Sequence, residues 1–332
     1  MGSATVFLGL CLISALAAPS AVAFTCSVRG PCYSLVDYIP PNATTYNAIK
    51  TLFGVKKVYN LFGANNLPIT TPPNGTVPAN QKVRIPFPCL CANGTGLSNR
   101  VPNYTVKAGE FLDFIARTIF SALTTYQEIA RVNGIPDPSA IEPGQQFWIP
   151  IPCSCDEVDG ARVVHYGHVV ESGSSVEEIA QKYNTTEDTL LKLNGMNSSG
   201  DLKASQLLDV PLHACSSSIR NDSFDHSLLL SNGTYALTAH QCVKCRCDAA
   251  KNMILQCEPS QLNSTSWNSC PSTQCSNDLY IGNSTSSVSL SSSACNATTC
   301  AYRGYNNATI FTSLVTDSST CQVILKQLIE DH

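Results

Sequence analysis

The chain has 332 residues, enough for two or three ordinary domains or for several small ones. Its formal net charge is −4, and only 13% of its residues are charged. These values argue against nucleic acid as a partner, which requires a basic face, and against a polybasic membrane-surface site. A neutral ligand fits them better.

The first 23 residues are interpreted as a secretory signal peptide. An apolar run from Val6 to Ala18 is followed by the small-x-small sequence that ends at Ala23. Of the 17 cysteines, Cys11 lies inside this segment, which leaves an even number for the mature chain. An even number is expected if all of them pair in an oxidising compartment.

Twelve asparagines precede x-Ser or x-Thr without an intervening proline, which makes each a candidate N-glycosylation site. They are Asn42, Asn74, Asn93, Asn103, Asn184, Asn197, Asn221, Asn232, Asn263, Asn283, Asn296 and Asn307. This density also indicates a secreted chain.

Three segments repeat one order of features, which predicts three strand–helix–helix–strand units. In two of them a glycine stands six residues before an isoleucine of the first helix, as Gly109–Ile115 and as Gly173–Ile179. The interval from an Asn-Gly pair to the closing proline is 17 residues in both, as Asn133–Pro150 and as Asn194–Pro211. We interpret the Asn-Gly pairs as helix stops, because they adopt positive φ easily.

The first copy of the repeat is more divergent. Tyr38 stands where the first strand is expected, Leu61 and Asn66 mark the second helix and its end, and residues 83–86 form the closing strand. Proline and Asn42 replace the glycine, and a glycan on Asn42 would obstruct a ligand there. We therefore interpret this copy as scaffold.

Units this small bury too little apolar surface to be stable alone. Disulfides formed by the cysteines at their junctions would stabilise them. Neighbours in Cys89-x-Cys91 and Cys153-x-Cys155 point to opposite sides of an extended segment, so bridges between units are expected. With Cys26 and Cys32 these make six cysteines, whose pairing the sequence alone leaves open. The expected boundaries are 24–92, 93–156 and 157–215 for the units, 216–321 for a cysteine-rich domain and 322–332 for a short tail.

The cysteine-rich segment is predicted to be a small β-rich disulfide domain of unknown function. Short strands are expected around residues 234–238 and 253–256, between turn-forming sequences. Cys242-x-x-Cys245-x-Cys247 resembles a zinc-ligand spacing, but in a secreted chain with even cysteines we favour disulfides.

Three stretches carry a resemblance to a known family: residues 125–129, 147–156 and 300–305. With the Pro-x-Pro-Cys-x-Cys junctions, they make the chain resemble the plant chitin-elicitor-binding receptor family of lysin-motif (LysM) proteins. The resemblance implies an α+β fold: three tandem βααβ LysM modules packed through inter-module disulfides, then a small β-rich disulfide-stapled domain. It also implies the bridges Cys26–Cys91, Cys32–Cys155 and Cys89–Cys153.

The resemblance further implies that N-acetylglucosamine oligomers bind between two loops of the middle module. The matching positions are Lys107, Ala108, Gly109, Glu110, Phe111 and Leu112 after the first strand, and Pro138, Ser139, Ala140, Ile141 and Glu142 before the last. Loop backbone can hydrogen-bond the acetamide, and Ile141 can contact its methyl group. A core role is the alternative for Phe111, Leu112 and Ile141, and it is favoured for Leu112. Gly109 fits either a tight turn or close approach of the ligand. The third module, which keeps Gly173, is a weaker candidate.

Three functions are weighed: a chitin-receptor component in plant innate immunity, a peptidoglycan-binding immune protein, and a cell-wall glycosidase with LysM targeting modules. A glycosidase needs two facing carboxylates, and the acids of 216–321 lie mostly in polar, loop-like sequence. No serine-hydrolase elbow or zinc-protease helix motif occurs. We interpret His165 and His168 as a surface pair rather than a metal site. We expect no enzyme, no cofactor and no metal.

The last residues, Gln322 to His332, are short and amphipathic and lack the apolar run of a lipid-anchor signal. The alternatives are a soluble secreted form and a sequence that ends through alternative processing. The expected location is the apoplast or the outer face of the plasma membrane. Signalling is expected to pass through a partner, for which the resemblance implies a LysM receptor kinase. A ligand-induced homodimer is a further expectation.

Overall fold

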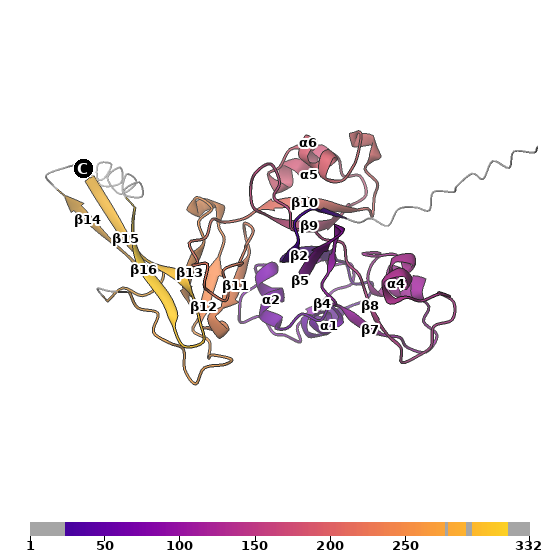
Figure 1. Cartoon of the computed structure of the whole chain (residues 1–332), viewed down its shortest axis with the longest axis horizontal. Helices are drawn as coiled ribbons and strands as arrows, with labels where there is room; N and C mark the ends of the chain where they lie inside the picture. Colours follow the sequence, from indigo (N-terminus) through magenta and orange to yellow (C-terminus); the bar gives the residue numbers. More distant parts are fainter. Residues whose placement is uncertain (1–23, 276–277, 290–293, 318–332) are drawn as a thin grey trace, which may run out of the picture.

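The computed structural model describes residues 24–275, 278–289 and 294–317. The expected signal peptide, Cys321 and the short tail lie outside these ranges. Figure 1 shows the helices α1 to α6 in one part of the molecule and the strands from β11 onward at the other end. Within the described ranges, no helix has the length and apolar character needed to cross a bilayer.

The first strand–helix–helix–strand unit is built around a long antiparallel pair. Its elements are β2 (Gly30–Tyr38), β3 (Thr44–Thr45), α1 (Tyr46–Leu52), α2 (Val58–Ala64), β4 (Thr76–Val77) and β5 (Val83–Ala92). Strand β2 pairs with β5 over its whole length, and β3 pairs with β4. Thr45 caps α1, since its hydroxyl oxygen accepts the Ala48 N–H.

The second and third units follow the same order of elements. The second consists of β7 (Asn103–Thr105), α3 (Leu112–Phe114), a π-helical turn (Ile115–Ile119), α4 (Tyr126–Asn133) and β8 (Gln146–Trp148). The third consists of β9 (Val163–Val169), α5 (Val176–Tyr183), α6 (Glu187–Leu193) and β10 (Leu207–His213). Gly134 and Gly195 follow α4 and α6 with φ of 64° and 61°, as expected for helix stops.

A six-stranded sheet joins the first and third units. Its order is β1 (Phe24–Cys26), β6 (Gly94–Ser98), β5, β2, β9 and β10. Strands β2 and β9, from different units, pair in parallel with Val36 opposite Gly167. A Cβ at Gly167 would lie 3.1 Å from the Val36 side chain, so glycine permits this close packing.

The core of the second unit is continuous with that of the first. The rings of Phe53 and Phe120, one from each unit, meet edge to face with centroids 5.6 Å apart. The third unit has its own cluster around Tyr166, Leu190 and Val210. The three units therefore form one packed body.

The interpretation of His165 and His168 as a surface pair is wrong. Their exposed fractions are 1% and 2%. The Nδ1 atom of His165 lies 2.9 Å from the Asp209 carboxylate, and that of His168 lies 2.9 Å from Asp37. The reason is that β9 lies between β2 and β10 in a sheet covered on both faces, so residues on both sides of the strand are buried.

The C-terminal domain consists of two small antiparallel sheets. Their strands are β11 (Tyr235–Thr238), β12 (Val243–Arg246) and β13 (Gln256–Pro259), then β14 (Ser284–Ser289), β15 (Ala294–Tyr305) and β16 (Ile310–Asp317). The strand expected at 253–256 begins only at Gln256, because Asn252 and Met253 adopt positive φ in a turn. Within the described part of the domain, the bridges are Cys215–Cys247, Cys242–Cys270, Cys245–Cys257 and Cys275–Cys300.

The C-terminal domain packs against the first unit, where β11 lies beside α2 (Figure 1). The Tyr235 hydroxyl donates to the Leu67 carbonyl over 2.7 Å. Gly63 of α2 sits directly against the Tyr235 backbone, since a Cβ there would lie 2.0 Å from its carbonyl oxygen. This close contact between α2 and β11 fixes the position of the C-terminal domain relative to the first unit.

Candidate functional site

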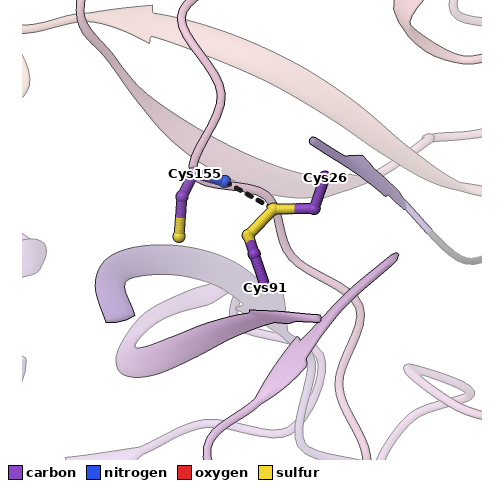
Figure 2. Close-up of side chains that lie close together, drawn as sticks. All are labelled: Cys26, Cys91 and Cys155. Atoms are coloured by element: carbon purple, nitrogen blue, oxygen red, sulfur yellow. Dashed lines mark hydrogen bonds between the residues drawn. A yellow bond between two sulfur atoms is a disulfide. The ribbon is translucent and has the colours of Figure 1, made fainter. Parts of the chain in front are cut away.

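Three disulfides hold the junction of the units: Cys26–Cys91, Cys32–Cys155 and Cys89–Cys153. These are the pairs that the resemblance implies. Figure 2 shows Cys26 joined to Cys91, with the Cys155 N–H donating to the Cys26 sulfur over 3.1 Å. The sulfurs of Cys26, Cys91 and Cys155 are close enough to suggest a metal site. All three are in disulfides, however, and a metal would need thiolates.

An asparagine at the end of the second helix ties that helix to the closing strand in every unit. In the second unit, Asn133 Nδ2 donates to the carbonyls of Ile129 and Trp148 over 2.8 and 2.7 Å. Its Oδ1 accepts the Trp148 N–H over 3.0 Å. The amide therefore fixes both ends of the loop that runs from α4 to β8.

Asn194 and Asn65 make the same three bonds in the other units. Asn194 joins α6 to Asp209, and Asn65 joins α2 to Arg84. Helix α2 ends at Ala64 with Asn65 as its cap, and Asn66 follows with a φ of 52°, so Asn66 marks the end of the helix as expected and takes the place that Gly195 has after Asn194. The interval from the asparagine to the strand residue that it bonds is 15 residues in the second and third units and 19 in the first. This difference hid the equivalence of Asn65 with Asn133 and Asn194 in the sequence.

Backbone bonds bring together the two loops of the middle unit that carry the candidate ligand-binding residues. The Val106 N–H donates to the Gln145 carbonyl, and the Gly144 N–H donates to the Val106 carbonyl, each over 2.9 Å. Val170 makes the corresponding bonds with Gln206 and Ser205 in the third unit. Each loop pair is thus joined at its base.

Most of the candidate side chains are exposed. Those exposed to solvent are Lys107, Ala108, Gly109, Phe111, Ser139, Ala140 and Glu142. Phe111 is 55% exposed, whereas Leu112 is 1% exposed and belongs to the core. Pro138 is half-buried, and Ile141 is partly buried against the core.

Gly109 has a φ of 82°, which favours glycine, and a Cβ there would meet nothing within 4 Å. The turn therefore requires this glycine, and the space beside it is open.

Two acidic side chains near these loops, Glu110 and Asp137, accept hydrogen bonds from nearby groups of the same unit. The Glu110 carboxylate accepts the Tyr104 hydroxyl over 2.8 Å and the Lys107 N–H over 2.9 Å. Burial, together with Glu110, raises the pKa of Tyr104, which keeps its phenol protonated as the donor. Asp137 accepts both the N–H and the hydroxyl of Ser139, and these bonds lower the pKa of Asp137. The exposed surface consequently offers loop backbone and small side chains, together with the charged side chains of Lys107 and Glu142.

Two concave surfaces lie away from these loops. One of about 310 Å³ is lined by Asn184, Thr186 and His213 of the third unit, among others. One of about 830 Å³ is lined by Arg220, Phe311 and neighbouring residues of the C-terminal domain.

The candidate glycosylation sites are exposed wherever the structure describes their side chains. The exposed ones are Asn42, Asn74, Asn93, Asn103, Asn184, Asn197, Asn221, Asn232, Asn263, Asn283 and Asn307. The side chain of Asn296 lies outside the described part. Exposure is a requirement for attaching a bulky glycan to a folded surface.

Comparison with known proteins gives two kinds of match. The family model of the LysM domain matches residues 104–150 and 168–211, which hold the second and third units. The chain is 49% identical over 293 residues to LysM domain-containing GPI-anchored protein 2 of Arabidopsis thaliana, covering 87% of this chain and 81% of the relative. It is 43% identical over 313 residues to the chitin elicitor-binding protein of Oryza sativa subsp. japonica, covering 91% and 84%.

More distant matches include a receptor kinase and a solved structure. The chitin elicitor receptor kinase 1 of Physcomitrium patens is 26% identical over 192 residues, covering 55% of this chain and 29% of that protein. The crystal structure of the ectodomain of a receptor like kinase matches with a TM-score of 0.47 and 19% identity, covering 56% of this chain and 94% of that one.

Proposed function

This chain belongs to the family of LysM domain-containing GPI-anchored proteins, and on that premise we propose that it is an extracellular, non-enzymatic receptor component that binds chitin oligomers. The observation that carries the proposal is the joined pair of loops, 107–111 and 138–142, in the second unit. Their backbone and small side chains face solvent, Glu110 and Asp137 bond within the loops, and the two exposed charges, Lys107 and Glu142, are of opposite sign. That chemistry suits a neutral sugar with acetamide groups.

The proposed organisation is three tandem LysM modules, 24–92, 93–156 and 157–215, followed by the cysteine-rich domain. The LysM family model matches the second and third. Support for the first comes from Asn65, which makes the same three bonds as Asn133 and Asn194 between the second helix and the closing strand.

The middle module is the proposed binding site because the other two are hindered. In the third module Glu171 occupies the position of Lys107, and its carboxylate accepts the Lys82 ammonium of the first unit over 2.8 Å. Its loop is therefore tied to another module. In the first module Asn42 is exposed in the corresponding loop, where a glycan would cover the surface.

Affinity at such a site requires an oligomer. A hydrogen bond contributes about 1 kcal/mol net, and ordering the ligand opposes binding. Several N-acetylglucosamine units held at once supply enough contacts, and a longer oligomer can reach a second copy of the protein. We propose that binding is signalled through a LysM receptor kinase, because the Physcomitrium patens kinase contains a region similar to this chain.

Calorimetric titration of the secreted protein with chitin octamers and with peptidoglycan fragments tests the proposal. We expect heat of binding with chitin octamers and none with peptidoglycan. Absence of heat with the octamer contradicts the proposal. Heat with peptidoglycan alone would show that peptidoglycan, not chitin, is the ligand. Chitin octamers should also stay uncut after long incubation, and shorter products would show an enzyme.

A further inference from the structure

Four aromatic side chains from distant parts of the chain meet on the surface of the C-terminal domain. The rings of His240 and Trp267 have centroids 4.6 Å apart, and His240 and Tyr305 have centroids 5.3 Å apart. Trp267 and Tyr305 are 5.9 Å apart, and Phe224 stands perpendicular to Tyr305 at 5.6 Å. We call these four residues the aromatic cluster.

The aromatic cluster is partly open to solvent. Phe224 is 58% exposed, and His240, Trp267 and Tyr305 are half-buried. Exposed aromatic rings gathered in one place leave apolar area in water that a covering group would remove. Such rings also match the apolar C–H face of a sugar.

The loop that joins β15 to β16 places Asn307 at the edge of the aromatic cluster. The Trp267 indole N–H donates to the Asn307 carbonyl over 2.7 Å. Tyr305, the last residue of β15, stands two positions before Asn307. The main chain at Asn307 therefore touches one ring of the cluster and lies beside another.

The conformation of this loop leaves the Asn307 side chain available. Asn306 holds the turn, because its Oδ1 accepts the N–H groups of Ala308 and Thr309, each over 2.9 Å. Asn307 itself is exposed and begins an Asn-Ala-Thr sequon. A glycan attached there starts at the rim of the exposed rings.

We propose that the N-linked glycan of Asn307 folds back so that its first N-acetylglucosamine covers the aromatic cluster. The glycan is then a structural part of the C-terminal domain, which removes apolar ring surface from water. Asn263 also carries a sequon and lies four residues before Trp267. We favour Asn307 because its own backbone bonds to the Trp267 ring.

The test compares Asn307→Gln with the matched variant Asn263→Gln, both secreted from a glycosylating host. Mass spectrometry of the parent reports whether Asn307 is occupied, and calorimetry reports Tm. We expect Asn307→Gln to lower Tm by about 2–4 °C and Asn263→Gln to leave it unchanged. In a Phe224→Ser background, the shift caused by Asn307→Gln should shrink.

Three results overturn the proposal: an unoccupied Asn307, a Tm shift no larger than that of Asn263→Gln, or a shift that Phe224→Ser leaves intact. A larger shift from Asn263→Gln would assign the cluster to that glycan instead.

A second measurement uses Trp267 as a local reporter. The chain has two tryptophans, so Trp148→Phe leaves Trp267 as the fluorophore. An endoglycosidase that leaves the first N-acetylglucosamine on asparagine should not change acrylamide quenching of Trp267. An amidase that removes the whole glycan should increase it. Equal quenching after both treatments contradicts the proposal, and Asn307→Gln should show the high quenching without treatment.

Discussion

The side chain of Asn133 bonds to both backbone polar groups of Trp148, donating to its carbonyl over 2.7 Å and accepting from its N–H over 3.0 Å. With the bond to the Ile129 carbonyl, one amide connects α4 to β8. The candidate loop 138–142 lies between these two elements. Its position therefore depends on a side chain that does not belong to the loop.

Replacing Asn133 by alanine should destabilise the protein and weaken chitin binding. Three hydrogen bonds are lost, and partly buried backbone groups lose their partners, so we expect a loss of about 2–4 kcal/mol in the free energy of unfolding. Denaturant unfolding and calorimetric titration measure the two effects. Asn194→Ala removes the same bonds from the third unit and should lower stability alone. Equal loss of binding in both variants would show that the amide does not act through the candidate loop.

The exposed loop position 108 offers a direct test of the site. Ala108→Asp introduces a carboxylate that a bound sugar would have to desolvate, so we expect chitin affinity to fall at least tenfold, about 1.4 kcal/mol. Ser172 is the matched position of the third unit, since Ala108 and Ser172 each precede the loop glycine. Ser172→Asp should leave affinity unchanged, and neither variant should alter Tm because both positions are exposed. The opposite pattern would move the site to the third module.

The buried Asp37 carboxylate should make stability depend on acid pH. It lies 2.9 Å from His168 Nδ1 and 3.2 Å from the Lys82 ammonium, and it accepts the Tyr166 hydroxyl. Burial by itself would raise the pKa of Asp37, but the bonds from His168 and Tyr166 and the charge of Lys82 hold it below its ordinary value.

A lowered pKa in the folded state means that Asp37 contributes its full stabilisation above its unfolded pKa, about pH 4. That contribution is lost as the pH falls through the lower folded value. Asp37→Asn should be less stable than the parent at neutral pH, and the two should converge in acid. Urea unfolding between about pH 2 and 7 measures this. Parallel pH profiles would show that Asp37 is not responsible.

Gly63→Ala should lower stability, although alanine normally stabilises a helix interior by roughly 0.5–1 kcal/mol relative to glycine. The added Cβ would lie 2.0 Å from the Tyr235 carbonyl oxygen, so the C-terminal domain must shift away from α2. We expect a lower Tm and faster proteolysis between the third unit and β11. Gly200→Ala is the control, because its nearest neighbour is 3.6 Å away. An unchanged or higher Tm for Gly63→Ala would mean that the Tyr235 backbone moves away from α2 without loss of stability.

Local signals in the sequence predicted the elements of the repeat well. The Asn-Gly pairs at Asn133 and Asn194 indicated where α4 and α6 end, and the structure has positive φ at the following glycines. These features depend on φ preferences and on the spacing of apolar residues within one helix, which short stretches of sequence contain. The candidate ligand-binding loops of the middle unit came from the family resemblance, and their role stays a prediction.

Apart from the expected disulfides between units, the packing of one unit on another was beyond such reasoning. The parallel pairing of Val36 with Gly167 buries β9 on both faces, so His165 and His168, polar residues that suggest a surface, are interior. The position of Asn65 was missed because the loop after α2 is four residues longer than its counterparts, which shifts the spacing. Neither the burial of these histidines nor the role of Asn65 produces a repeating pattern of residues that can be recognised in the sequence.

Composition and intervals counted along the chain predicted a secreted chain with repeated units and an even set of cysteines for the mature protein. The family and its sugar ligand came instead from the resemblance that three stretches of the sequence carry. Three other findings required the folded structure: Asn133 and Trp148 hold the candidate loop, Asp37 is buried between units, and the aromatic cluster lies beside Asn307. Each joins residues far apart in sequence or in different elements, and such contacts form only when the whole chain packs.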